Sequence, residues 1–116
     1  MSESTGMSTL EYHVLLALAG GARYGYAIKD AVSEESSGTL TPRAGSLYRV
    51  LARLMTSGLV TESKSAAADA EPHPGLARRY YALSAKGRTA LATEASRLKV
   101  AAAMAERRLR TAQSRS

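Results

Sequence analysis

Residues 41–60 have the sequence TPRAGSLYRVLARLMTSGLV, and the predicted fold depends on this stretch more than on any other. Threonine followed by proline is typical of a helix start, because threonine caps free N–H groups and proline suits the first helical position. We therefore predict a helix capped by Thr41, with Pro42 at its first position, that runs to about Ser57. Gly58 stands where a glycine commonly ends a helix.

The predicted helix has two faces of different character. At 100° per residue, one side gathers the apolar residues Leu47, Leu51 and Leu54, flanked by Val50 and Met55. The opposite side carries small, hydroxyl-bearing and basic residues, namely Gly45, Ser46, Arg49, Ala52 and Arg53. Short side chains let a helix approach the major groove of DNA, where the two arginines can reach phosphates or guanine edges. On this helix alone, a solvated face that only keeps the protein soluble is an equally good interpretation.

Two shorter helices are predicted before this one. Ser8 and Glu11 have the spacing of a capping box, in which each side chain bonds the backbone N–H of the other residue. The first helix is expected to end at the glycines 20–21, and its apolar face comprises Leu10, Val14, Leu15 and Leu18. The second helix spans about 25–36, and its buried side chains are expected to be Ala31, Val32 and one of Tyr26 and Ile28.

A β-hairpin is predicted after the third helix. Residues 59–64 and 77–83 have the composition of strands, and the segment 66–76 between them contains two prolines and a glycine, as is typical of a loop. Side chains alternate between the two sides of a strand. The second strand should therefore leave one arginine and one tyrosine facing outward from the pairs Arg78/Arg79 and Tyr80/Tyr81.

The base of this hairpin carries three basic residues, Lys64, Arg78 and Arg79. In a winged-helix protein the hairpin contacts the groove or backbone beside the recognition helix. Asp69 and Glu71 lie near the predicted tip, where they would repel phosphate. We therefore expect the base of the hairpin, and not its tip, to contact DNA.

A long helix is predicted from Ser84 to about Arg110, because the segment is rich in alanine, arginine and lysine and contains no proline. Its apolar residues recur at alternating intervals of four and three, which is a heptad pattern: Leu91, Ala95, Leu98, Ala102, Ala105 and Leu109. Small alanines let two helices approach closely, so we expect this seam to form a dimer interface. The seam is short for an isolated coiled coil and would need support from the first helix or from the partner's body.

Charge is distributed unevenly along the chain, whose net charge is +6. Residues 1–76 carry six basic and eight acidic side chains, whereas residues 77–116 carry ten basic and two acidic ones. Such an excess favours a polyanionic partner, although it also promotes solubility. Only two of those ten basic residues belong to the predicted hairpin, so most of the excess supports general attraction to DNA or solvates the last helix.

Several classes of function are excluded or disfavoured by composition. The chain has no cysteine and only two histidines, so disulfides and thiolate zinc sites are excluded and a metal site is not expected. Nucleotide-binding loops and the common hydrolase motifs are absent, so we expect no cofactor and no enzymatic activity. No apolar run is long enough to span a membrane, and the polar start lacks a signal-peptide core, so a soluble cytoplasmic protein is expected.

Three motifs in a fixed order resemble those of the PadR family of winged helix-turn-helix transcriptional regulators. They are GYAI at 25–28, GSLYRVLARLMTSGLV at 45–60 and RRYYALSAKGRTAL at 78–91. The last two are similar to the family's recognition helix and to its second wing strand with the following helix start. Arg49 stands where the family often has proline, and Tyr24 where it often has histidine. The added charge of Arg49 is expected to alter base preference.

The resemblance implies a mainly helical fold with a small β-hairpin. It predicts a winged helix-turn-helix domain at 8–83, a dimerisation helix at 84–112 and flexible termini at 1–7 and 113–116. Ser46 and Tyr48 match positions implicated in DNA contact in the family. Together with the residues chosen above, the expected DNA contacts are Thr41, Arg43, Ser46, Tyr48, Arg49, Arg53, Lys64, Arg78 and Arg79.

The resulting functional hypothesis is a homodimeric repressor. It would bind a pseudo-palindromic DNA operator, and the resemblance implies release by a small, often aromatic, effector bound at or near the dimer interface. The alternative is a winged-helix module that uses the same seam to bind another protein and has no sequence-specific affinity for DNA.

Overall fold

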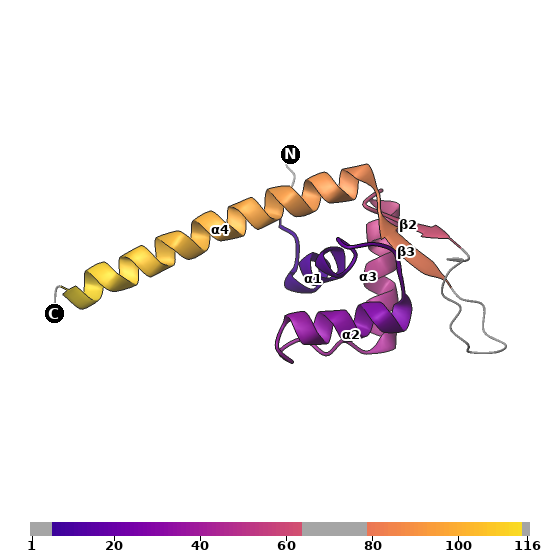
Figure 1. Ribbon diagram of the computed structural model, residues 1–116, viewed down its shortest axis with the longest axis horizontal. Helices are drawn as coiled ribbons and strands as arrows, with labels where there is room; N and C mark the ends of the chain where they lie inside the picture. The colour runs from indigo at the N-terminus through magenta and orange to yellow at the C-terminus, as the bar shows by residue number, and fades with distance from the viewer. Residues whose placement is uncertain (1–5, 64–78, 115–116) are drawn as a thin grey trace.

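The computed structural model describes residues 6–63 and 79–114, which form a helical body, a small sheet and a long C-terminal helix (Figure 1). In chain order the elements are α1 (Thr9–Ala17), β1 (Arg23–Tyr24), α2 (Gly25–Glu35), α3 (Ala44–Thr56), β2 (Val60–Ser63), β3 (Tyr80–Leu83) and α4 (Ala85–Ser114). The predicted fold class, mainly helical with a small β-hairpin, is therefore confirmed, and a third strand joins the hairpin. The predicted loop 66–76 lies outside the described residues.

Helix α1 begins with the predicted capping box. The backbone N–H of Glu11 donates to the Ser8 hydroxyl over 3.1 Å, and the Ser8 N–H donates to the Glu11 carboxylate over 2.9 Å. Two N–H groups that the helix cannot satisfy internally thus have partners. The helix stops before Gly21, whose φ of 146° is a conformation that only glycine adopts readily.

Of the two side chains of α2 that the sequence offered for burial, Tyr26 and Ile28, the structure buries Ile28. Ile28 is fully buried, together with Ala31 and Val32, whereas the ring of Tyr26 is 61% exposed. Helices α1, α2 and α3 pack on one another around this apolar cluster, to which β2 and β3 also contribute.

Helix α3 starts at Ala44, so the prediction that Thr41 caps it is wrong. The N-cap residue is Arg43, and the segment 41–43 runs as an extended connector without regular structure. Upstream, the Ser36 hydroxyl accepts the N–H of Leu40 over 2.9 Å and thereby holds the turn that leaves α2. The connector must then reach the point where Leu47, the first fully buried residue of α3, meets the core. Residues 41–43 span this distance, so α3 begins at Ala44 and not at Pro42.

The end of α3 agrees with the sequence. Gly58 has a φ of 79°, and the N–H of Leu59 donates to the carbonyl of Leu54 over 2.9 Å. A left-handed glycine that closes the last turn in this way is a common helix terminus. It turns the chain directly into β2.

The sheet has three strands, and β3 lies in its middle. Strand β2 pairs with β3 as the predicted hairpin requires, with Val60 opposite Leu83. The two-residue strand β1 pairs with the other edge of β3, with Tyr24 opposite Tyr80. Strand β1 is too short to be predicted from the sequence, because two residues carry no periodic signal.

The expectation that one tyrosine of β3 faces outward is wrong. Tyr80 and Tyr81 are both buried, at 5% and 3% exposure. Tyr81 joins the main apolar cluster, and the ring of Tyr80 lies 5.8 Å from the ring of Tyr24 on β1. Alternation still holds, but Tyr81 packs in the core and Tyr80 packs beside its cross-strand neighbour Tyr24, so neither ring is available to a partner.

Helix α4 is anchored to the body through its first turn. The Ser84 hydroxyl accepts the N–H of Gly87 over 2.9 Å and donates to the carbonyl of Gly58 over 2.6 Å. Gly87 is buried against the backbone of Leu59, and a Cβ there would overlap the Leu59 carbonyl oxygen. Glycine is therefore required for α4 to approach the end of α3 this closely.

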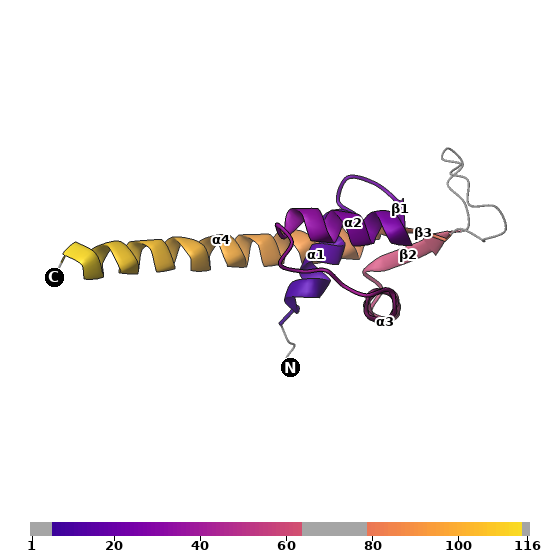
Figure 2. The same cartoon turned by 90° about the horizontal axis from the view of Figure 1, so that it is seen from below.

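Beyond its first turns, α4 extends away from the body as a single arm (Figures 1 and 2). Of the six seam residues, Leu91 is half-buried against the chain's own core. The other five are exposed, and Leu109 is 69% exposed. Glu94, at the base of the arm, is buried and bonded by Arg97 over 3.0 Å, which lowers the pKa of the Glu94 carboxyl. In the described part of the chain, no helix has the length and apolarity needed to cross a membrane.

Replacing Gly87 with alanine should lower the free energy of unfolding by about 1–3 kcal/mol, because the new methyl group forces α4 away from Leu59. Gly45→Ala is the matched control, since a Cβ at Gly45 meets no atom within 4 Å and alanine favours a helix. Urea denaturation of both variants measures the difference, and equal midpoints for Gly87→Ala and the wild type would contradict the close approach.

Candidate nucleic-acid interface

The face of α3 that was predicted to meet a partner is exposed. Gly45, Arg49, Ala52 and Arg53 are exposed and Ser46 is half-buried, whereas the other side of the helix is buried through Leu47, Val50, Leu51 and Leu54. Each such buried leucine stabilises the fold by about 1.5–3 kcal/mol. Helix α3 therefore cannot rotate without losing its core, and this fixes which residues face outward.

Arg49 lies at the centre of the exposed face. Among the ion pairs of the described residues, none involves Arg49 or Arg43, which precedes the helix. The side chain of Arg43, the N-cap residue, makes no capping hydrogen bond to the first turn of α3. The start of the helix thus has the Arg43 guanidinium beside backbone N–H groups that the N-cap side chain does not bond, an arrangement that favours an anion.

Arg53 is held by a partner from outside its own helix. Its Nε donates to the carboxylate of Glu11 on α1 over 3.1 Å, while the same carboxylate completes the capping box. The charge of Arg53 is thereby offset at the C-terminal end of α3. The pair also ties α3 to the start of α1, although at 60% exposure of Arg53 its contribution to stability is small.

At the base of the hairpin, the charge of an arginine is likewise offset by a carboxylate. Arg79 precedes β3, and its guanidinium donates to the Glu62 carboxylate on β2 over 2.8 Å. Lys64 and Arg78, the other predicted hairpin contacts, lie outside the described residues, as do the tip carboxylates Asp69 and Glu71. Thr41 is exposed in the connector before α3, close in sequence to Arg43.

Tyr48 leaves the predicted face at its edge and leans toward α2. A Cβ at Gly25 would overlap the Tyr48 hydroxyl, so the absence of a side chain at Gly25 makes room for this ring. Beside it, Tyr26 and Lys29 border a hollow of about 150 Å³ between α2 and α3, whose remaining lining is Gly25, Ala44 and Leu47. Tyr48 was predicted from the sequence to lie on the interface, whereas Tyr26 and Lys29 were not, although both follow Gly25 within about one helical turn.

The phenol of Tyr81 on β3 is affected by the charges of residues on β2 and α3 and beside β3. Burial chiefly raises the pKa of its phenol above 10, the nearby Glu62 carboxylate and Tyr48 raise it further, and Arg79 opposes them. Glu62 therefore interacts with two groups at the base of the hairpin: it accepts a hydrogen bond from Arg79 and raises the pKa of Tyr81.

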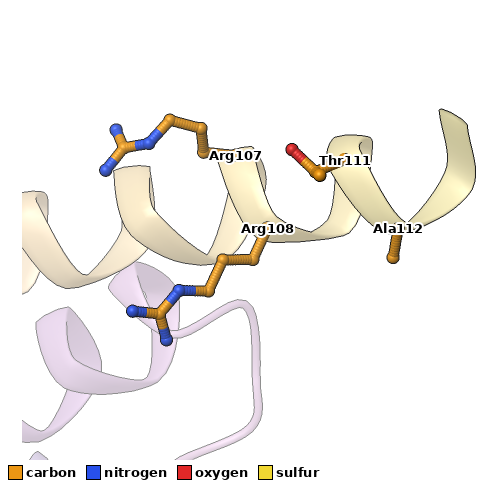
Figure 3. Close-up of a pocket in the computed structure, with 4 residues that line it drawn as sticks. All are labelled: Arg107, Arg108, Thr111 and Ala112. Atoms are coloured by element: carbon orange, nitrogen blue, oxygen red, sulfur yellow. The ribbon is translucent and has the colours of Figure 1, made fainter. Parts of the chain in front are cut away.

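A second hollow lies far from α3, on the C-terminal part of α4. It is lined by Arg107, Arg108, Thr111 and Ala112, and Figure 3 shows the two arginine side chains leaving the helix on different sides. All of its lining residues come from a single helix. It is therefore an open surface between long side chains and encloses no ligand site.

Comparisons with known proteins agree with this architecture. A family model described as the transcriptional regulator PadR-like family matches residues 14–93. A search of curated proteins finds no match. The chain is similar to the X-ray structure of a PadR-like transcription factor from Bacteroides fragilis, at 27% identity and a TM-score of 0.67 over 84% of this chain and 86% of that one.

Two further solved structures share the fold at lower identity. A PadR family transcription regulator from Clostridium difficile has 20% identity and a TM-score of 0.70, over 88% of this chain and 99% of that one. Bacillus subtilis PadR in complex with operator DNA has 23% identity and a TM-score of 0.61, over 74% of this chain and 46% of that one. At these identities the likeness establishes the fold alone.

The raised pKa of Tyr81 predicts how stability depends on pH. The folded chain keeps this phenol protonated to a higher pH than the unfolded chain does, so the free energy of unfolding should fall as pH rises above about 10. Tyr81→Phe removes that contribution, and its stability should fall less steeply over the same range. Urea denaturation between pH 8 and 11 compares the two slopes, and parallel curves throughout would contradict the environment assigned to Tyr81.

Proposed function

The chain belongs to the PadR-like family of transcriptional regulators, and we propose on this basis that it is a homodimeric repressor of a pseudo-palindromic DNA operator. Members of this family are regulators and not enzymes. The observation that carries the proposal is the exposed face of α3, where Arg49 stands without a carboxylate partner among the described residues. Bacillus subtilis PadR, a structural relative, was solved with operator DNA.

In the proposed complex, α3 occupies the major groove. Ser46 and Arg49 lie where they contact base edges, because the small residues beside them allow a close approach. Tyr48, Arg43 and Thr41 contact phosphates near the start of the helix, where N–H groups are uncapped. Arg53 and Arg79 contribute less charge than their number suggests, since carboxylates already offset both.

The α4 arm supplies the proposed dimer contact. Ala95, Leu98, Ala102, Ala105 and Leu109 share one side of the helix and are exposed in the single subunit. Pairing this stripe with a second copy buries it, and a two-fold axis would place the two α3 helices about one turn of DNA, or 34 Å, apart. That spacing matches a pseudo-palindromic operator.

Effector release is the remaining part of the proposal and rests on family resemblance. A small aromatic compound that binds at or near the dimer interface would change the distance between the two α3 helices and so release the DNA. Titration of small aromatic compounds against the protein–DNA complex tests this part separately from DNA binding itself.

Selection of bound sequences from random duplex DNA tests the proposed function directly. The expected result is one enriched sequence with two-fold symmetry and half-sites about one helical turn apart. Failure to enrich any sequence, with no footprint on the DNA upstream of the chain's own gene, would instead favour a protein-interaction module.

Arg49→Ala should weaken binding to the selected operator by about 1–3 kcal/mol and relax base preference at one position. Arg53→Ala is the matched control on the same helix, and its effect should be smaller, because Glu11 already offsets the Arg53 charge. Fluorescence anisotropy at constant salt measures both against the operator and against single-base variants. A uniform loss over all duplexes would assign Arg49 to the DNA backbone.

Leu98→Glu should convert the dimer into monomers, because it introduces a charge into the middle of the seam. Val100→Glu provides the control, since Val100 is 60% exposed and lies on the other side of α4. Light scattering coupled to size-exclusion chromatography gives the mass of each variant. An unchanged dimer mass for Leu98→Glu would refute the role of the seam.

A further inference from the structure

The two arginines on the exposed face of α3 differ in their electrostatic surroundings. Arg49 and Arg53 are four residues apart, so their side chains leave the same side of the helix about 6 Å apart along its axis. Arg53 forms an ion pair with Glu11 of α1, whereas no ion pair within the part of the chain that the structure describes involves Arg49. One of two similar cations is therefore offset by a carboxylate that comes from another helix.

The Glu11 carboxylate is held in place independently of Arg53. Its Oε1 accepts the Ser8 N–H over 2.9 Å, and the Ser8 hydroxyl accepts the Glu11 N–H over 3.1 Å. Its Oε2 accepts the Nε–H of Arg53 over 3.1 Å. Because both oxygens are bonded and only 18% of the side chain is exposed, the carboxylate has little freedom to change its position.

Arg53 is the partner that can exchange, because its side chain is 60% exposed and has open space beside it. Together with Met7, Ser57 and Leu59 it borders a hollow of about 300 Å³ between the segment before α1 and the end of α3. An exposed ion pair is weak, so a second anion can compete for the guanidinium. A DNA phosphate is such an anion, and it binds arginine through the same charge-assisted hydrogen bonds.

We propose that Glu11 restrains DNA binding by competing with a backbone phosphate for Arg53. In the free protein Arg53 is paired with Glu11, and on DNA its guanidinium must leave this carboxylate or share it with a phosphate. In either case the attraction of Arg53 to DNA is reduced by the interaction that it loses. The contacts of Ser46 and Arg49 with bases then make up a larger share of the binding free energy. This inference rests on the proposed function.

Glu11→Gln tests the inference, because it removes the carboxylate charge and keeps the capping box. Glutamine is also found at this position of the box, where its amide oxygen accepts the same N–H. For a dimer with two freed Arg53 side chains, affinity at 0.1 M salt should rise by about two- to thirtyfold on operator and random duplexes alike. The slope of log affinity against log salt concentration should steepen by up to about 1.8, as measured by fluorescence anisotropy.

Glu34→Gln is the matched control, because it removes one carboxylate charge from an exposed position on α2. It measures the effect of net charge alone, so its affinity and salt slope should stay close to those of the wild type. The double variant Glu11→Gln/Arg53→Ala then tests whether the effect depends on Arg53. In the Arg53→Ala background, Glu11→Gln should change affinity no more than Glu34→Gln does. Urea denaturation of each variant confirms that it is folded.

The possible outcomes distinguish the inference from the proposed function. If Glu11→Gln binds DNA like Glu34→Gln, or more weakly than the wild type, Glu11 does not compete with phosphate and the inference is overturned. The repressor proposal stands in that case as long as Arg49→Ala still weakens operator binding. A gain in affinity that persists in the Arg53→Ala background would also overturn the inference, because it would not depend on Arg53. Wild-type protein that binds no duplex overturns both.

Discussion

Burial of one side of α3 is the constraint on which the rest of this structure depends. Leu47, Val50, Leu51 and Leu54 all lie in the core formed with α1 and α2, and rotating the helix would expose them. The cost of that exposure, about 1.5–3 kcal/mol for each large side chain, exceeds the net worth of any surface contact the helix makes. The opposite side must therefore face outward, whatever its residues are, and this is why small and basic residues there can serve a partner without harm to the fold.

Glycines set how closely the other elements approach α3. Gly87 lets α4 lie against the backbone of Leu59, immediately after the end of α3, and Gly25 leaves room for the Tyr48 ring beside the start of α2. In both cases a methyl group would occupy space that a neighbour already fills. The long arm and the hollow between α2 and α3 are thus positioned relative to the same helix, one at each end. A dimer built through the arm would carry each reading face at a set distance from the two-fold axis.

Ion pairs offset part of the positive charge on and around α3. Arg53 and Arg79 are both compensated, by Glu11 and Glu62, so the arginines of α3 and its N-cap that lack a carboxylate partner among the described residues are Arg43 and Arg49. The eight basic residues from Lys86 onward follow β3 in the sequence and do not belong to α3. Net charge indicated a polyanionic partner, but the residues that produce most of it are not those proposed to bind specifically.

The amino-acid sequence by itself determined the features that depend on neighbours a few residues apart. These include the capping box at Ser8, the apolar stripe of α3, the left-handed Gly58 that ends it and the heptad pattern of α4. Each follows from hydrogen bonds or side-chain spacing within one or two helical turns, so a local pattern suffices to predict it. The resemblance to a known family then supplied the order of these elements in space.

Only the tertiary structure decided the features that join distant segments. Strand β1 places Tyr24 beside Tyr80, the helical core buries Tyr81, and Glu11 reaches Arg53 across 42 residues of sequence. The helix start at Ala44 likewise depends on how far the connector must travel before Leu47 meets the core. Such contacts depend on how distant elements pack and not on neighbouring residues in the sequence. For this reason no local sequence pattern predicts them.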